Sequence, residues 1–154
     1  ESEGDVARAY GQILEGAKKY DPNAVVQGVL VQKMAPQGQE VILGMNRYPT
    51  FGPLLMFGMG GIFVEVFQDV RFCLAPVERD EAVEMIQGVK GFKLLNGFRG
   101  KPRVDIESVE KLIVNLSQLA TNHPEILEMD INPLLVHVEG QGATVADCRM
   151  ILRK

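Results

Sequence analysis

The sequence is 154 residues long, with 46% hydrophobic residues, 23% charged residues and a formal net charge of −4. These values predict a single globular domain, residues 1–154, and exclude collagen-like, coiled-coil, low-complexity and disordered chains. The negative charge and an aromatic content of 6% argue against a nucleic-acid partner, which needs basic residues for the backbone and aromatic rings for the bases.

The first half of the sequence predicts one helix followed by several strands. Apolar residues recur at helical spacing over 5–19, where Asp5 is the expected N-cap, and turn residues at 20–23 end the helix. Short β-rich or apolar runs then follow at 28–34, 40–46, 51–57, 62–67 and 69–75. The glycine-rich residues 58–61 separate the third run from the fourth.

The second half predicts two helices and a final pair of strands. A helix is expected over 78–89, and a glycine-dotted connection follows it. The clearest helix begins after the N-cap Asp105, carries an apolar stripe and ends before Pro124. Two β-like runs, 126–138 and 143–150, come last. Strands in hairpin-like pairs with helices inserted predict an α+β (or α/β) fold with a largely antiparallel sheet.

Three further features exclude other classes of protein. The most apolar stretch, 54–67, is too short for a bilayer and contains three glycines and Glu65, so we expect no membrane segment. A β-like run rather than a helix follows the glycines of FGMGGIF, which excludes a Rossmann dinucleotide-binding fingerprint. Cys73 and Cys148 lack the spacing of a zinc site and predict reduced thiols in a cytoplasmic protein.

The most informative motif is EMDINP at 128–133. Because side chains alternate along a strand, Glu128, Asp130 and Asn132 are expected to share one face. Three oxygen-bearing side chains on one face are more than a simple core strand needs. Pro133 cannot donate to a ladder, so the strand is expected to lie at an edge or to change partner there.

The register of the last two strands predicts a metal site. If Glu139 and Gly140 form a two-residue turn, Asn132 falls opposite Asp147 on the same face. Directly opposed Cβ atoms lie about 4.5–5.5 Å apart, so an amide oxygen and a carboxylate there can hold one Mg²⁺ ion. The alternative is that Asp130 and Asp147 are solvated edge residues, because a shift of one residue destroys the pairing.

Several ordered motifs resemble one known family. Residues 28–77, together with EMDINPLLV at 128–136 and ATVADCRM at 143–150, resemble the ATP-grasp region of NDP-forming acyl-CoA synthetases. These are the ADP-forming acetate–CoA ligases and their fused relatives, related to succinyl-CoA synthetase. The resemblance implies that Asn132, in the [E/D]-x-N-P motif, and Asp147, in the V-x-D-x-R motif, are the Mg²⁺ ligands beside the nucleotide phosphates. The hairpin register therefore indicates the same two residues.

The resemblance also implies nucleotide contacts in the first half of the chain. It places the backbone of Gln32, Lys33 and Met34 along the adenine edge, whereas the residues alone indicate only a strand leaving the core. It places Glu40 near the nucleotide, although by itself this is an ordinary surface glutamate. It also puts the glycine loop that includes Gly60 and Gly61 near the active site. The glycines by themselves indicate either N–H groups offered to an anion or a tight turn between two apolar strands.

Three charged positions complete the expected site. Arg99 lies in a G-x-R-G element and can contact phosphate or carboxylate, or be solvated. Asp130 is expected to tune or extend the metal site or to meet an incoming phosphohistidine. Cys73 stands where the family's F-R-x-A-P stretch has arginine, and Arg71, two residues earlier, is a candidate to replace that charge on the same face.

The resemblance implies half of a catalytic site. The chain is expected to be the C-terminal portion of an ATP-grasp fold that uses Mg²⁺ with ATP or ADP, and to be inactive alone. The partners implied are the missing N-terminal ATP-grasp half and a CoA-ligase (alpha) subunit or domain. One alternative is a non-catalytic ATP-grasp module for nucleotide sensing or assembly, fused to an acetyltransferase. Another is an α+β domain with an acidic edge strand and no ligand.

Overall fold

The computed structural model describes residues 2–61 and 67–153. It divides the chain into two compact units, Glu1–Met34 and Ala35–Lys154. The apolar run expected at 62–67 falls almost entirely on 62–66, outside the described residues. Among the helices of the described residues, none is long and apolar enough to cross a membrane.

The first unit contains helix α1, Glu3–Tyr20, followed by an irregular segment. The helix is confirmed, but its N-cap is Ser2 rather than Asp5, which instead completes a capping box as the third helical residue. The strand expected at 28–34 is wrong, because residues 22–38 have no regular secondary structure. Its apolar side chains have no neighbouring strand to pair with or pack on: Leu30, Val31 and Met34 are 81%, 83% and 87% exposed.

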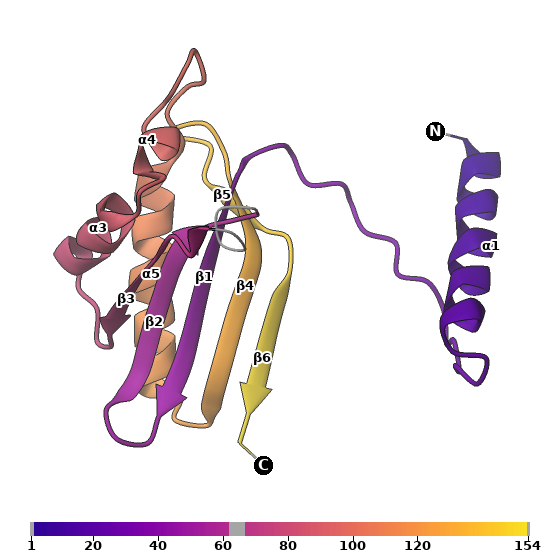
Figure 1. Cartoon of the computed structure of the whole chain (residues 1–154), viewed down its shortest axis with the longest axis horizontal. Coiled ribbons are helices and arrows are strands. Elements are labelled where there is room, and N and C mark those ends of the chain that lie inside the picture. The colour runs from indigo at the N-terminus through magenta and orange to yellow at the C-terminus, as the bar shows by residue number, and fades with distance from the viewer. Residues whose placement is uncertain (1, 62–66, 154) are drawn as a thin grey trace. The chain divides into compact units, whose positions relative to one another are not determined.

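The second unit is built on an antiparallel sheet, as predicted (Figure 1). The described residues give six strands in the order β3-β2-β1-β4-β5, with β6 also paired to β4. Their bounds are Gln39–Tyr48 for β1, Gly52–Met59 for β2, Val70–Leu74 for β3, Ile126–Val136 for β4, Ala143–Val145 for β5 and Cys148–Leu152 for β6. The run expected at 143–150 is therefore two strands, with residues 146 and 147 between them, opposite Asn132 and Pro133, where β4 also shifts its register against β1.

Three helices of this unit lie against one face of the sheet, and no other helix is described between Ala35 and residue 153 (Figure 1). They are α3 at Arg79–Gly88, α4 at Phe92–Leu95 and α5 at Ile106–Asn122. Alternate residues of the central strands, such as Leu43 and Phe57, point into the core, where they are fully buried with Ile113 of α5. Asp105 caps α5 as predicted. The sequence pattern missed α4, because four residues are too few to show helical periodicity.

Arg47 fixes the connection between α5 and β4. Its Nε donates to the carbonyl of Ile126 at 2.8 Å, and its guanidinium also donates to the carbonyls of His123, at 3.0 Å, and Ala120. The last carbonyls of a helix lack partners within the helix and carry partial negative charge. A cation from β1 therefore satisfies the end of α5 and holds the start of β4 in place.

Candidate functional site

The face of the sheet opposite these three helices carries the two acidic side chains of β4. Asp130 pairs with Gly44 of β1, and Glu128 pairs with Asn46, so both carboxylates lie on this face as the alternation predicted. A Cβ atom on Gly44 would lie 3.9 Å from Asp130 Oδ1. This is an ordinary van der Waals separation, so the Asp130 carboxylate lies beside Gly44 of β1. Both acidic residues line a hollow of about 110 Å³ together with Asn46 and Met56.

The predicted hairpin register is confirmed. The Gln141 N–H donates to the carbonyl of Val138 at 2.9 Å, which closes the two-residue turn. On either side of the irregular point, Leu134 pairs with Val145 and Ile131 pairs with Cys148. At that point, the Asn132 N–H donates to the Asp147 carbonyl at 3.2 Å, so these two residues lie opposite each other.

Asn132 and Asp147 are both exposed, so their side chains are open to a ligand. Asp147 Oδ1 accepts a hydrogen bond from the Cys148 N–H at 2.9 Å, which leaves its second oxygen outside that hydrogen bond. Among the residues that the structure describes, no three His, Cys, Asp or Glu side chains gather as a metal cluster. An amide oxygen and one carboxylate suit Mg²⁺, which keeps waters and takes substrate phosphates as its other ligands.

The carboxylates of Asp130 and Asp147 both act on the thiol of Cys148. Burial raises the pKa of the Cys148 thiol, and the carboxylates of Asp147 and then Asp130 raise this pKa further. Arg149 pairs with Asp130 across the ladder, and its Nη2 lies 3.9 Å from Glu128 Oε1. At this distance, an exposed ion pair contributes little. The region therefore retains negative charge that favours a cation.

The structure brings Glu40 together with Gly60 and Gly61. The Gly60 N–H donates to the Glu40 carbonyl at 3.0 Å, and a Cβ on Gly60 would lie 2.9 Å from the Glu40 carbonyl carbon. Gly61 has φ +61°, and its Cβ would lie 3.4 Å from Glu40 Oε2. The Gly60 amide is thus already paired, and this glycine serves close packing of the turn. The nucleotide contacts of all three residues stay a prediction.

The expected adenine-edge residues lie in the first unit. Gln32, Lys33 and Met34 are exposed and belong to the irregular segment rather than to a strand end. Backbone groups outside a ladder are available to hydrogen-bond a ring edge. Their role stays a prediction.

The two arginines differ in where they point. Arg99 lies exposed in the loop between α4 and α5 with φ +51°, and its guanidinium carbon is 5.3 Å from the centre of the Phe98 ring. Arg71 shares a face with Cys73, as expected, but this is the helix side of β3. Its side chain packs on Gly88 of α3, where a Cβ would lie 2.8 Å from Arg71 Nε. Arg71 therefore lies on the face of Cys73 that was expected, and its replacement of the family's arginine stays a prediction.

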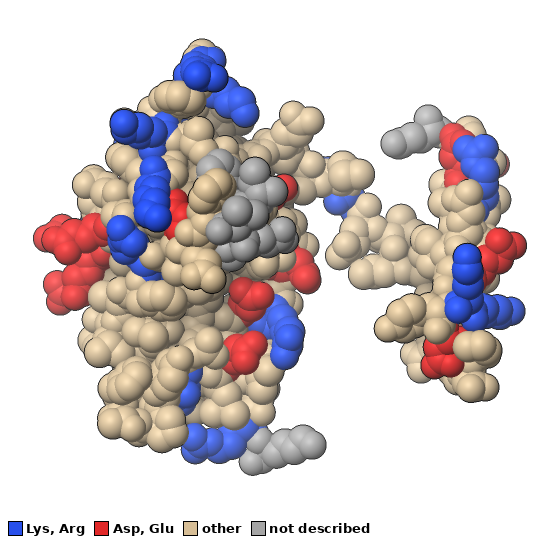
Figure 2. Space-filling model, in the orientation of Figure 1, with Lys and Arg blue, Asp and Glu red and all other residues tan. Residues whose placement is uncertain are grey.

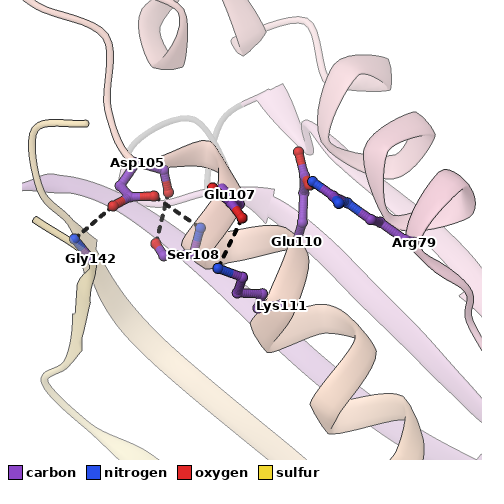
Figure 3. Close-up of polar contacts among 7 residues, drawn as sticks. All are labelled: Arg79, Asp105, Glu107, Ser108, Glu110, Lys111 and Gly142. Atoms are coloured by element: carbon purple, nitrogen blue, oxygen red, sulfur yellow. Dashed lines mark hydrogen bonds and ion pairs between the residues drawn. The ribbon is translucent and has the colours of Figure 1, made fainter. Parts of the chain in front are cut away.

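A polar clamp that the sequence did not reveal holds the hairpin of the site (Figure 3). The carboxylate of Asp105 accepts hydrogen bonds from the Ser108 N–H at 3.0 Å and from the Gly142 N–H at 2.8 Å. The Asp105 N–H donates to the carbonyl of His137 at 2.8 Å. The cap of α5 is thus also tied to the β4–β5 hairpin, which sets the register of Asn132 and Asp147.

We expect Asp105→Ala to lower the free energy of unfolding by about 1–2 kcal/mol at neutral pH, as for other lost N-caps. The hydrogen bond from Gly142, followed by that from Ser108, lowers the pKa of Asp105. The Asp105 carboxylate therefore stabilises the fold fully when the pH is above the ordinary pKa of a carboxyl group. This stabilisation is lost as the pH falls through the lowered pKa of Asp105 in the folded chain. Urea unfolding of both proteins should show a difference at pH 7 that shrinks in strong acid. Asp80→Ala, in the first turn of α3, is the control.

Comparison with known proteins identifies the family. Residues 1–152 match the model of the ATP-grasp domain family. The chain belongs to the ATP-grasp domain family. The family expected from the motifs is therefore confirmed.

Relatives of this ATP-grasp chain include an acetate–CoA ligase and a subunit of another. It is 47% identical over 150 residues to an ADP-forming acetate–CoA ligase I of Archaeoglobus fulgidus, covering 97% of the chain and 22% of the relative. It is 44% identical over 148 residues to the beta subunit of an ADP-forming acetate–CoA ligase I of Pyrococcus furiosus. This match covers 96% of the chain and 63% of the subunit. The ATP-grasp chain thus spans less than two thirds of either relative.

Solved structures agree with this assignment. The ATP-grasp chain superposes with a TM-score of 0.91 and 46% identity on a dinucleotide-forming acetyl-coenzyme A synthetase 1 of Ca. Korarchaeum cryptofilum, in complex with coenzyme A, Ca-AMPCP and HgCl⁺. The match covers 99% of the chain and 66% of that structure. A selenomethionine derivative of that synthetase, with coenzyme A and Mg-AMPPCP, gives a TM-score of 0.84 at 42% identity, covering 99% and 65%.

Proposed function

We propose that this chain is the Mg²⁺- and nucleotide-binding part of an ADP-forming acyl-CoA synthetase. The complete enzyme would convert acid, CoA and ATP reversibly into acyl-CoA, ADP and phosphate, through an acyl phosphate and a phosphohistidine. The observation that carries the proposal is the pairing of Asn132 with Asp147 on exposed neighbouring positions. Identities of 44–47% with ADP-forming acetate–CoA ligases support it.

Asn132 and Asp147 would hold the metal ion through one amide oxygen and one carboxylate oxygen. Both are hard oxygen donors, and their exposure leaves space for phosphate oxygens and water. A bound Mg²⁺ ion would neutralise the negative charge of the phosphates and orient the phosphoryl group that is transferred. The chain's own contribution is the hairpin register, which holds Asn132 of β4 opposite Asp147, between β5 and β6, before any ligand arrives.

Other residues would complete the nucleotide and phosphoryl contacts. Asp130 precedes Asn132 by two residues on the same face of β4 and would extend that site or meet the phosphohistidine. Arg99 would contact phosphate or carboxylate with its forked donors. The backbone of 32–34 would border the adenine. Glu40, with the glycines packed on it, would lie near the nucleotide.

The complete enzyme would need further polypeptide. We propose the N-terminal half of the ATP-grasp fold and a CoA-ligase (alpha) subunit or domain as partners. Coverage of 63% of a relative named a beta subunit, and of 22% of a longer ligase, supports both. The free thiols Cys73 and Cys148 support a cytoplasmic location.

Calorimetric titration tests the nucleotide role. The chain is titrated with ADP in the presence of Mg²⁺ and again with EDTA, and we expect binding that depends on the metal. The same titration is then repeated with the proposed partners added, followed by an assay of CoA ligation. Metal-dependent binding without ligation by the assembled proteins would favour a non-catalytic nucleotide-sensing module. No binding in either state by folded protein would contradict the proposal.

A further inference from the structure

A hollow of about 320 Å³ lies beside α4, outside the residues assigned to the nucleotide. Its apolar lining includes Phe67, Leu94 and Phe98, and its charged lining residues are Asp69, Lys90 and Lys93. Small-molecule sites typically have volumes of about 300–1,000 Å³ and a mainly apolar lining with a few polar groups. The hollow therefore has the size and lining of a ligand site.

The carboxylate in the hollow is already engaged by the backbone. Asp69 is only 3% exposed, and its two oxygens accept hydrogen bonds from the N–H groups of Lys90 and Gly91, both at 2.7 Å. Its charge is thus directed at the junction of α3 and α4. The wall that a ligand meets consists mainly of hydrocarbon, including the aromatic rings of Phe67 and Phe98.

The surroundings of the hollow are strongly cationic, although the whole chain has a net charge of −4. Figure 2 shows basic side chains gathered over α4 and the loop after it. In sequence, residues 85–104 contain five Lys and Arg residues and no Asp or Glu. The guanidinium of Arg99 lies over Phe98, whose side chain lines the hollow. The region around the hollow therefore carries an excess of cations, which favours an anionic ligand.

We propose that this hollow binds a small amphipathic carboxylate, aliphatic or aromatic. The hydrocarbon part would pack among Phe67, Leu94 and Phe98, and the carboxylate would face Lys90 and Lys93. A hydrocarbon group gains free energy by leaving water for such a lining, and the lysines discriminate the sign of the charge. Apart from Arg99, the residues of this hollow take no part in the proposed function, and the test uses neither nucleotide nor metal.

The sequence contains no tryptophan, so a single substitution provides a unique fluorescent reporter. Phe98→Trp places it in the hollow, and Phe51→Trp, in the turn between β1 and β2, is a control of similar exposure (44% against 50%). Each protein is titrated with octanoate and with octylamine, which has the same chain length and the opposite charge. We expect octanoate to change the emission of Phe98→Trp saturably and that of Phe51→Trp not at all.

Charge removal at the opening tests the role of the lysines. In the Phe98→Trp background, Lys90→Gln combined with Lys93→Gln should weaken octanoate binding about tenfold, the effect of two partly screened ion pairs. Lys18→Gln with Lys19→Gln, on α1, is the matched control and should bind normally. Circular dichroism verifies that each variant is folded. Calorimetry of the unmodified chain with octanoate shows whether the reporter itself alters the hollow.

Three results would overturn the inference. The first is the lack of saturable octanoate binding by both the reporter protein and the unmodified chain. The second is equal affinity for octylamine, which would mean that the hollow recognises hydrocarbon alone. The third is unchanged octanoate affinity in the folded double lysine variant.

Discussion

Replacing Asp147 by asparagine should abolish the metal-dependent part of nucleotide binding. Asp147→Asn keeps the size of the side chain but removes the one charged ligand of the proposed Mg²⁺ site. Loss of groups that merely orient metal ligands already costs about 10–100-fold, so we expect at least about 100-fold weaker binding of Mg-ADP. Calorimetry measures this directly. The free energy of unfolding should change little, because the Asp147 side chain is exposed.

The same variant offers a check that requires no nucleotide. The negative charge of Asp147 helps to raise the pKa of Cys148, so Asp147→Asn should lower that pKa toward its ordinary value. Alkylation of Cys148 at mildly alkaline pH, followed by peptide mass spectrometry, should therefore be faster in the variant. Asp80→Asn, on α3, is the control for both measurements. Mg-ADP binding as tight as in the unmodified chain would remove Asp147 from the metal site.

The largest loss of stability is expected from Asp69→Ala. The buried carboxylate satisfies two backbone N–H groups at the junction of α3 and α4 with short hydrogen bonds of 2.7 Å. Alanine would leave both donors without their partner, and each buried unsatisfied group costs about 1–3 kcal/mol. We expect the free energy of unfolding to fall by about 2–5 kcal/mol, measured by urea denaturation.

An asparagine at this position separates the two hydrogen bonds. Asp69→Asn keeps one acceptor oxygen but turns an amide group toward the other N–H, so its loss of stability should lie between zero and that of the alanine variant. Asp21→Ala, at the exposed end of α1, controls for removal of a charge. An Asp69→Ala protein within about 0.5 kcal/mol of the original would mean that water or local rearrangement satisfies both donors.

The sequence was sufficient where a local signal determines the structure. The N-cap Asp105 and the apolar stripe after it located α5, because both signals lie within the helix itself. A two-residue turn at Glu139 and Gly140 was enough to pair Asn132 with Asp147, since turn length sets the register of a hairpin. The backbone pairing of the candidate metal ligands was therefore predictable from the turn.

The sequence was insufficient where structure depends on distant residues. The β-rich run at 28–34 has the composition of a strand but no neighbouring strand in the first unit. Arg47 contacts carbonyls at the end of α5, and Asp105 holds Gly142, through contacts that no spacing rule indicates. The packing of Arg71 on α3 could not be predicted either, because only the fold shows which face of β3 lies against that helix.

The pairing of β1 with β4 has a consequence for how the chain acquires its structure. β1 and β2 form a local hairpin, but β1 gains its second neighbour only from β4, far along the chain. During synthesis on a ribosome, one edge of β1 therefore stays open until β4 emerges, and pairing across such separations is intrinsically slow. The β4–β5 hairpin, by contrast, closes over a short loop. We therefore expect the register of the candidate metal pair to form early in folding. Pairing of β1 with β4, which joins the two hairpins, is expected to be the slow step. The chain is most prone to aggregate before that step is complete.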